Sequence, residues 1–492
     1  MPFRAPRAAI SSALVALVTA GLWAACGGEP GPATGPATPA VVPPSASDPL
    51  RQPRPLLGAG SCTSAGCHAA AVEGHAAWQS SFTVWSTRDR HARAHRVLFE
   101  PLAERIVAAL AARDPGTAHV PAHRNTACVG CHATARGSLA SEGVSCESCH
   151  GPAGDWLVSH TLPGWKTHGN AAGMVDLADP FTAARQCAGC HVGGQPAPDG
   201  AVREVSHDLI AAGHPRLAFE LRSYKRAEPP HWHDRFTTVA ADAAAGTSTA
   251  PRPGPLDEWG LGRLGAMRAF LEQVSLQTTA APRGDRRGTE TAGIWPEFTA
   301  FDCYGCHRPA TAPQDRGGTA PAAGLPLGIP RLEPLHWALL DLAVSPEAAA
   351  TLGRFRADVE RRWWQPPDAA AIEECLAAID AARTHFHPPF ADMPTAAAAA
   401  TIVAGVDPSR WDEAAAGLAA LEATVDRAAS RNTDAGTIAA ARERLAALRR
   451  LLEFPQAERD GRPSRYDSPR DYDAGLVAAE LAAVAAALRA AR

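Results

Sequence analysis

Residues 143–160 read GVSCESCHGPAGDWLVSH and contain two cysteines two residues apart, a histidine directly after them and a second histidine ten residues later. The same Cys-x-x-Cys-His pattern occurs at residues 128–132, 187–191 and 303–307, and a wider form with four intervening residues lies at 62–68. These five pairs use 10 of the 12 cysteines, leaving only Cys26 and Cys375 outside them. The chain therefore repeats one arrangement of ligands five times.

Cys-x-x-Cys-His is the pattern of covalent haem c attachment, in which both thiols add to the haem vinyl groups and the histidine becomes the proximal iron ligand. We therefore expect five haems c. The wider first motif is included because it ends in the same histidine and accompanies four regular copies. The predicted attachment residues are Cys62, Cys67, Cys128, Cys131, Cys146, Cys149, Cys187, Cys190, Cys303 and Cys306, and the predicted proximal ligands are His68, His132, His150, His191 and His307.

Two other uses of paired cysteines explain the pattern less well. Structural zinc sites combine two such pairs and do not require a histidine directly after each one. A redox disulfide also leaves the five histidines without a role.

The amino terminus indicates export. Two arginines precede an apolar run over residues 8–25, which is typical of a signal peptide and too short for an ordinary membrane span. Residues 22–26 resemble a bacterial lipobox, although Trp23 stands where leucine is usual. We predict a signal peptide over 1–25, lipidation of Cys26 and a location on the periplasmic side of a bacterial membrane. Cleavage without lipidation is the alternative.

Composition separates the rest of the chain into regions. Residues 26–56 are rich in Pro, Gly, Ala and Ser and predict an unpacked tether. Residues 57–315 carry every motif and predict a multihaem domain of short helices and long loops, because porphyrins supply buried apolar mass. A Pro/Gly linker is expected at 316–330.

The net charge of −4 gives no basic footprint for nucleic acid.

Helical periodicity dominates residues 331–492, where we expect an Ala-rich helical bundle without a haem motif. Another helix is expected from Pro255 to Leu276, before the fifth motif. Asp473 and Thr433 are predicted helix caps, and Cys375 is predicted to be a small core residue. The apolar faces are expected at Ile372, Leu376 and Ile379; at Leu418, Leu421 and Val425; at Leu445, Leu448 and Leu452; and at Val477, Leu481, Val484 and Leu488.

The second axial ligands are expected to be histidines. The sequence has only four methionines, whereas fourteen histidines remain after the five proximal ones. Bis-histidine ligation usually gives lower reduction potentials than methionine–histidine ligation.

Four segments, FTVWSTRDRHARAHRVL, EGVSCESCHGPAGDWLVSH, HDLIAAGHPRLAFEL and PPHWHD, resemble the multihaem cytochromes c of the cytochrome c-554 type. The resemblance covers roughly residues 60–340. It implies a mainly α fold with long loops, closely packed haems and electron transfer between periplasmic partners. It also implies that the distal ligands are His91, His160, His207, His214 and His231, with His95 a doubtful extra and His75, His119, His123, His168, His233 and His336 in reserve.

The expected function is therefore that of an exported pentahaem electron carrier, rather than a catalyst, with redox proteins as partners and a lipid anchor in the membrane. The alternative is a multihaem reductase or oxidase of a small nitrogen or sulfur compound, which requires one open haem iron. A third possibility is an interaction protein with structural haems, for which five haems would be excessive.

Overall fold

The computed structural model describes residues 55–75, 77–113, 120–162, 173–194, 203–231, 253–279, 295–303, 329–431, 433–453 and 473–489. The predicted signal peptide, Cys26 and almost all of the predicted tether and linker lie outside the described residues. Cys306, His307, His119, His168 and His233 also lie outside them. Residues Pro53–Arg492 form one compact unit.

The region of the cysteine motifs is built from short helices joined by loops, as expected. Three of these helices, α3, α4 and α6, end at the histidine of a motif, so each Cys-x-x-Cys-His lies within one or two helical turns. The α-helices described in this region are α1 (Ser81–Arg88), α2 (Pro101–Arg113), α3 (Thr126–His132), α4 (Cys146–His150), α6 (Pro180–His191), α7 (His207–Ala211) and α8 (Leu221–Ala227).

Side-chain caps explain where two of the motif helices begin. Asn125 accepts a hydrogen bond from the Ala127 amide at the start of α3. Asp179 accepts from the Phe181 and Thr182 amides at the start of α6. Such caps satisfy amides that have no partner inside the helix, so they fix the position of the motif that follows.

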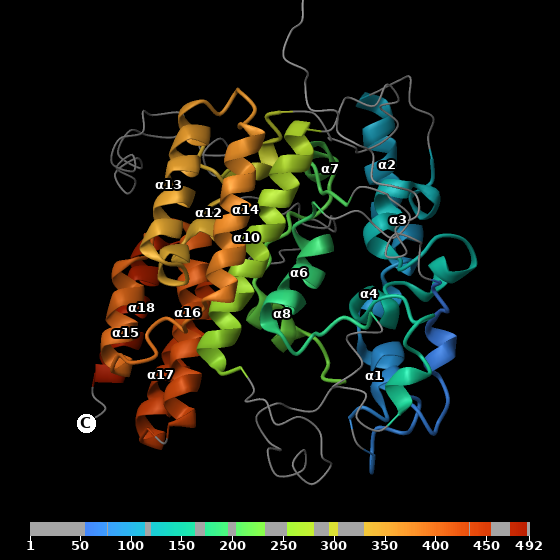
Figure 1. Cartoon of the computed structure of the whole chain (residues 1–492), viewed down its shortest axis with the longest axis horizontal. Coiled ribbons are helices and arrows are strands. Elements are labelled where there is room, and N and C mark those ends of the chain that lie inside the picture. The colour runs from blue at the N-terminus through green and yellow to red at the C-terminus, as the bar shows by residue number, and fades with distance from the viewer. Residues whose placement is uncertain are drawn as a thin grey trace, which may run out of the picture. The chain divides into compact units, whose positions relative to one another are not determined.

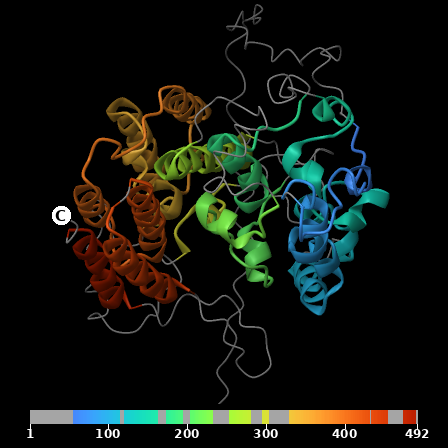
Figure 2. The same ribbon diagram turned by 90° about the horizontal axis from the view of Figure 1, so that it is seen from below.

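Helix α10 (Pro255–Thr279) forms the middle of the described unit, and the predicted helix over 255–276 is confirmed. Its side chains Trp259, Leu264, Met267 and Leu271 are fully buried. It packs against α6 and α8 on one side and against the helices that follow residue 334 on the other (Figures 1 and 2). A Cβ on Gly265 would lie 2.6 Å from the Phe181 carbonyl oxygen, so glycine permits the close contact with α6.

Seven further α-helices follow among the described residues, and every apolar face predicted there is buried: Ile372, Leu376 and Ile379 in α14, Leu418, Leu421 and Val425 in α16, Leu445, Leu448 and Leu452 in α17, and Val477, Leu481, Val484 and Leu488 in α18. The helices are α12 (Pro334–Trp337), α13 (Pro346–Arg361), α14 (Ala369–Thr384), α15 (Thr395–Ala404), α16 (Trp411–Ser430), α17 (Ala435–Leu452) and α18 (Ala474–Arg489).

One of the two predicted caps is correct. Asp473 accepts a hydrogen bond from the Leu476 amide at 3.0 Å and caps α18. Thr433 was the wrong cap for α17, because the next residue, Asp434, accepts from the Thr437 amide at 2.9 Å. Cys375 is 1% exposed and packs in the core, as expected.

Strand structure in the described part of the chain is limited to one isolated antiparallel bridge, between Phe301 and Leu332. It joins the segment that leads into Cys303 to the segment that leads into α12. Two backbone hydrogen bonds of 2.8 Å flank it, from Asp302 to Arg331 and from Glu333 to Ala300. Across the described ranges, none of the helices has the length and apolar character needed to cross a membrane.

Candidate axial histidine pairs

Three predicted proximal histidines each face a predicted distal histidine. The ring centroids are 6.1 Å apart for His68 and His160 and 6.2 Å apart for His191 and His91. They are 6.4 Å apart for His132 and His214. In every pair one ring comes from a Cys-x-x-Cys-His motif or its wider form, and the other comes from the set that the family resemblance supplied.

These separations match two imidazoles bound to opposite sides of one iron. Two metal–imidazole bonds of about 2.0 Å, with about 1.15 Å from each ligating nitrogen to its ring centroid, place the centroids about 6.3 Å apart. Rings stacked face to face in van der Waals contact would be much closer. The planes of the His68 pair lie 13° apart, whereas those of the His191 and His132 pairs lie 72° and 88° apart. Both orientations are compatible with axial ligation, because each ring can rotate about its metal–nitrogen bond.

Hydrogen bonds at Nδ1 orient these rings. Nδ1 of His68 lies 2.6 Å from the Trp78 carbonyl oxygen, and Nδ1 of His132 lies 2.9 Å from the Ala94 carbonyl oxygen. On the distal side, Nδ1 of His214 lies 2.8 Å from the Pro215 carbonyl oxygen. Metal-bound histidines usually engage their second nitrogen in this way, which fixes the tautomer and presents Nε2 to the metal.

His91 has a carboxylate partner instead of a carbonyl. Its Nδ1 lies 3.1 Å from Oδ1 of Asp89, which is 4% exposed, and this hydrogen bond raises the pKa of His91. The loop around Gly143 holds the same segment, because the Val144 amide donates to the His91 carbonyl oxygen at 3.0 Å. Gly143 has φ of 71°, and a Cβ there would lie 2.6 Å from that oxygen. The Gly of the EGVSC segment is therefore required by the position of His91.

His150 lies within electrostatic range of three predicted ligands, one of which is His231. Burial lowers the pKa of His150 to about 4, and the nearby imidazoles of His231, His68 and His160 lower it further. Nδ1 of His231 lies 3.3 Å from the Pro229 carbonyl oxygen. Burial also lowers the pKa of His191 to about 4. The rings of His150 and His191 are thus neutral at pH 7, which is the state in which imidazole binds a metal.

The candidate sites lie next to one another. A hydrogen bond with Cys146 of the third motif lowers the pKa of the Cys62 thiol in the first motif to about 6. In the same way, Cys131 of the second motif lowers the pKa of Cys190 in the fourth to about 6. Cys149 interacts electrostatically with Cys187, which links the third motif to the fourth. The four motifs therefore form a connected group, in the spatial order first, third, fourth and second.

The fifth motif opens beside a cavity. Cys303 lines it together with His191 and His336. The rest of the wall is mixed, with apolar side chains Val192, Val205, Ile210, Leu217 and Phe270 and polar or charged side chains Arg216, Gln273, Thr299 and Glu333. His207 lies beside this region, with its ring 5.5 Å from that of Phe298 and its amide donating to Glu297 at 2.8 Å. The cavity joins the fourth motif, through His191, to the start of the fifth.

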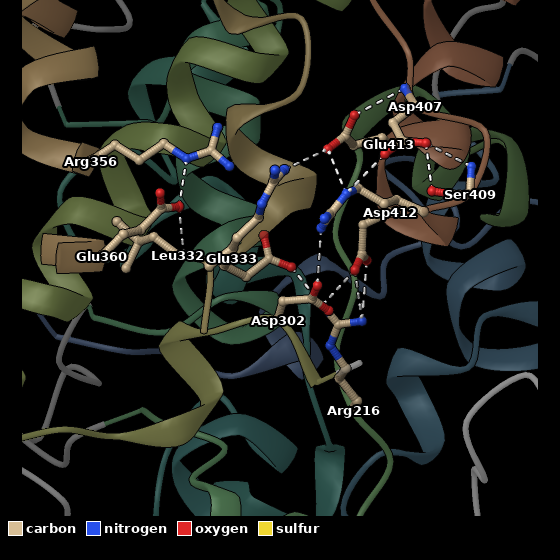
Figure 3. A network of polar contacts seen from close by, with 12 residues as sticks. Arg216, Asp302, Leu332, Glu333, Arg356, Glu360, Asp407, Ser409, Asp412 and Glu413 are labelled. Carbon is tan, nitrogen blue, oxygen red and sulfur yellow. Dashed lines mark hydrogen bonds and ion pairs between the residues drawn. The ribbon is translucent and has the colours of Figure 1, made fainter. Parts of the chain in front are cut away.

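Two residues of the cavity wall, Arg216 and Glu333, belong to a buried network of charges (Figure 3). Arg216 donates to Glu333 at 2.6 Å and to Asp412 at 3.1 Å, and Asp412 is 1% exposed. Arg410 pairs with Asp302 at 3.3 Å. Burial raises the pKa of Asp412 to about 7, and the carboxylates of Glu333 and Asp302 add to this effect against the opposing charge of Arg216. This network connects the GHPRLAFEL segment, the fifth motif and α16.

The sequence identified the histidines of these pairs but not the pairing, the contact of Asp89 with His91 or the charged network.

His95 lies close to His132, and its Nε2 is buried with no hydrogen-bond partner among the described residues. His123 stacks on Phe99 with ring centroids 4.3 Å apart, and His385 is exposed. In the part of the chain that the structure describes, no cluster of three or more His, Cys, Asp or Glu residues could hold a metal ion.

No protein-family model matches the chain, and no matching relative was found among curated proteins or solved structures.

Proposed function

We propose that this protein is a pentahaem c-type cytochrome that transfers electrons between redox partners outside the cytoplasm. The observation that carries the proposal is the set of three ring pairs, with centroids 6.1, 6.2 and 6.4 Å apart, each joining a motif histidine to a distal candidate. Unrelated surface histidines would have no reason to meet at the spacing of two axial ligands. A haem c fits each pair, because the attachment cysteines lie within one or two turns of one of the two histidines.

The ten motif cysteines would hold the haems covalently, and bound haem would supply reversible one-electron chemistry at iron. The protein's own contribution is to hold both imidazoles of a site in fixed positions, which keeps the ligand set the same in both oxidation states. In this proposal His68 pairs with His160, His132 with His214, His150 with His231 and His191 with His91. His207 remains a candidate for the fifth iron.

The contacts between motifs support a carrier. Hydrogen bonds join Cys62 to Cys146 and Cys131 to Cys190, and Cys149 lies within electrostatic range of Cys187, so successive sites are close to one another. Electrons could therefore pass along the array without leaving the protein. The first site has open surroundings, since Trp78 beside His68 is 45% exposed and Val158 near His160 is 76% exposed. We assign the entry or exit of electrons to this end.

The successive regions of the chain would have different roles. The cysteine motifs would form a multihaem domain, and the helices after residue 331 would form an Ala-rich bundle that supports the fifth motif. Cys26 would carry a lipid that anchors the protein to the periplasmic side of a bacterial membrane, with the Pro-rich segment as its tether.

The purified protein is expected to carry five covalent haems. The test is intact-mass measurement after acid–acetone extraction, which removes haem that is not covalently bound, and the expected result is five haem additions. A variant with Ala at Cys62 and Cys67 should show four. If the wild type already shows four and the variant shows the same number, the wider first motif does not attach haem.

Replacing Cys26 with serine is expected to move the protein from the membrane fraction to the soluble periplasmic fraction, because serine cannot receive the thioether-linked lipid. The measurement is fractionation together with the mass of the mature amino-terminal peptide. A matched Cys375→Ser variant should remain with the membranes. A wild-type protein that is soluble and carries no lipid mass would refute the anchor.

A further inference from the structure

The first observation is the position of Asp89, which follows helix α1 and precedes the predicted distal ligand His91 by two residues. Its side chain is 4% exposed, and its backbone amide donates to the Trp85 carbonyl oxygen at 3.1 Å. One carboxylate oxygen, Oδ1, accepts from the His91 amide at 2.9 Å and lies 3.1 Å from Nδ1 of the same residue. A single buried oxygen thus holds both the backbone and the ring of His91.

The second observation is that hydrogen bonds surround this contact. Nε1 of Trp85 donates to the Val144 carbonyl oxygen at 3.0 Å, and the Val144 amide donates to the His91 carbonyl oxygen at 3.0 Å. The end of α1, the loop at Val144 and His91 are therefore joined in a closed set of contacts to which Asp89 belongs. A charged group that is already held in place does not need to reorient when the charge beside it changes.

The third observation is the sign of the charge at His91. An ionised carboxylate only accepts hydrogen bonds, so Nδ1 carries the proton, and Nε2 is left for the side of His191, whose ring centroid is 6.2 Å away. A second carboxylate, that of Glu228, has Oε1 3.9 Å from the same Nδ1 and is 25% exposed. By contrast, Nδ1 of His132 and of His214 lies beside a backbone carbonyl oxygen, which carries no net charge.

These contacts have a consequence for an iron bound between His91 and His191. A carboxylate at the second nitrogen raises the basicity of an imidazole ligand. Reduction adds one electron to the iron and transfers no atom, so the more basic ligand and the buried negative charge both oppose it. Hydrogen bonds around the ligands and burial are among the ways in which a protein sets a haem potential.

We propose that Asp89 lowers the reduction potential of the haem attached at Cys187 and Cys190 by positioning His91 and placing a negative charge behind it. This inference rests on the proposed function, since it presupposes haem at the fourth motif. The fourth motif lies between the third and the second in space. Asp89 therefore places an energetic step between the first and third sites on one side and the second site on the other.

The test compares Asp89→Asn, Glu228→Gln and the exposed control Glu374→Gln in the haem-loaded protein, because each removes one negative charge. A redox titration followed by electron paramagnetic resonance gives the potentials and spin states, and intact mass counts haems. Asparagine keeps an oxygen that can accept from the His91 amide, so we expect five haems and no new high-spin iron. We expect one haem to become at least tenfold easier to reduce, which is about 59 mV for a one-electron couple.

The other variants grade this effect. Glu228→Gln should raise the same potential by less, because its oxygen is farther from Nδ1 of His91 and more exposed. Glu374→Gln, at a side chain that is 63% exposed, should change no potential. Adding Asp89→Asn to a protein that lacks the fourth haem, through Cys187→Ala and Cys190→Ala, should no longer produce the shift.

Unchanged potentials in Asp89→Asn would overturn the inference and leave the proposed function intact. New high-spin iron in that variant would also overturn it, because Asp89 would then only hold His91 in place. If Asp89→Asn does not fold, Glu228→Gln decides the question, and unchanged potentials there would overturn the inference. A wild-type protein without covalent haem would overturn the proposed function itself.

Discussion

Replacing Arg216 with methionine is expected to lower the free energy of unfolding by about 3–5 kcal/mol, which is the usual cost of removing one partner from a buried ion pair. Arg216 is 19% exposed, whereas the two carboxylates that it contacts, Glu333 and Asp412, are 9% and 1% exposed. Methionine has a similar length, so the main change is the loss of the guanidinium charge and its hydrogen bonds. Two acidic groups would then remain buried without their main cation.

The measurement is urea unfolding of the haem-loaded protein at pH 7.5, followed by far-ultraviolet circular dichroism. Arg354→Met is the matched control. Its guanidinium lies 3.4 Å from Glu374, but both side chains are more than 60% exposed, and exposed pairs contribute about 0–1 kcal/mol. A loss below about 1 kcal/mol in Arg216→Met would show that the charged network does not stabilise the fold.

The double variant Arg216→Met with Asp412→Asn separates charge from packing. If the buried charge on Asp412 causes the loss, neutralising it should recover part of the stability, so that the double variant is more stable than the sum of the single effects predicts. Additive losses would instead indicate that the two side chains act independently.

The network also illustrates what sequence alone does not reveal. Arg216 stands in GHPRLAFEL, Glu333 stands before α12, and Asp412 stands in the first turn of α16. Each is an ordinary charged residue in its local sequence, and each acquires its role only when distant segments pack together. No local periodicity encodes such a contact, because charge pairing across the fold depends on tertiary positions.

Local patterns did predict the helices. The burial of Ile372, Leu418, Leu445 and Val477 follows from helical spacing, because only one face of each helix meets a core. The error at Thr433 has an equally local cause. Two adjacent residues can both cap a helix, and the carboxylate of Asp434 takes the role.

The candidate histidine pairs fall between these two cases. The cysteine spacing identifies one histidine of each site, but its partner comes from a segment far along the chain, as with His68 and His160. The resemblance supplied the distal set, and only the fold gives the pairing. Asp89 carries no signal of its own in the sequence, because its role appears only when the fold buries its carboxylate against His91.

Replacing His214 with alanine is expected to convert one low-spin haem to high-spin and to leave all five haems attached. The reason is that the His214 ring lies 6.4 Å from that of His132, the spacing of two axial ligands, while covalent attachment depends on cysteines. Its Nδ1 is held by the Pro215 carbonyl oxygen at 2.8 Å, whereas the ring of His95, which also lies close to His132, packs edge-on against Phe99. Electron paramagnetic resonance and intact mass measure the two quantities on one sample.

The pairing itself can be tested by combining His214→Ala with Cys128→Ala and Cys131→Ala, which remove the haem of the second motif. If His214 serves that haem, the combined variant should lose one haem and show no new high-spin iron, because the affected iron is absent. His75→Ala, which changes an exposed histidine whose Nδ1 lies 3.2 Å from the Glu73 carbonyl oxygen, is the matched control and should leave the spectrum unchanged. New high-spin iron in the combined variant would assign His214 to another haem. A wild-type high-spin haem that binds nitrite or hydroxylamine would instead favour a reductase or oxidase, since such an iron already has an open position.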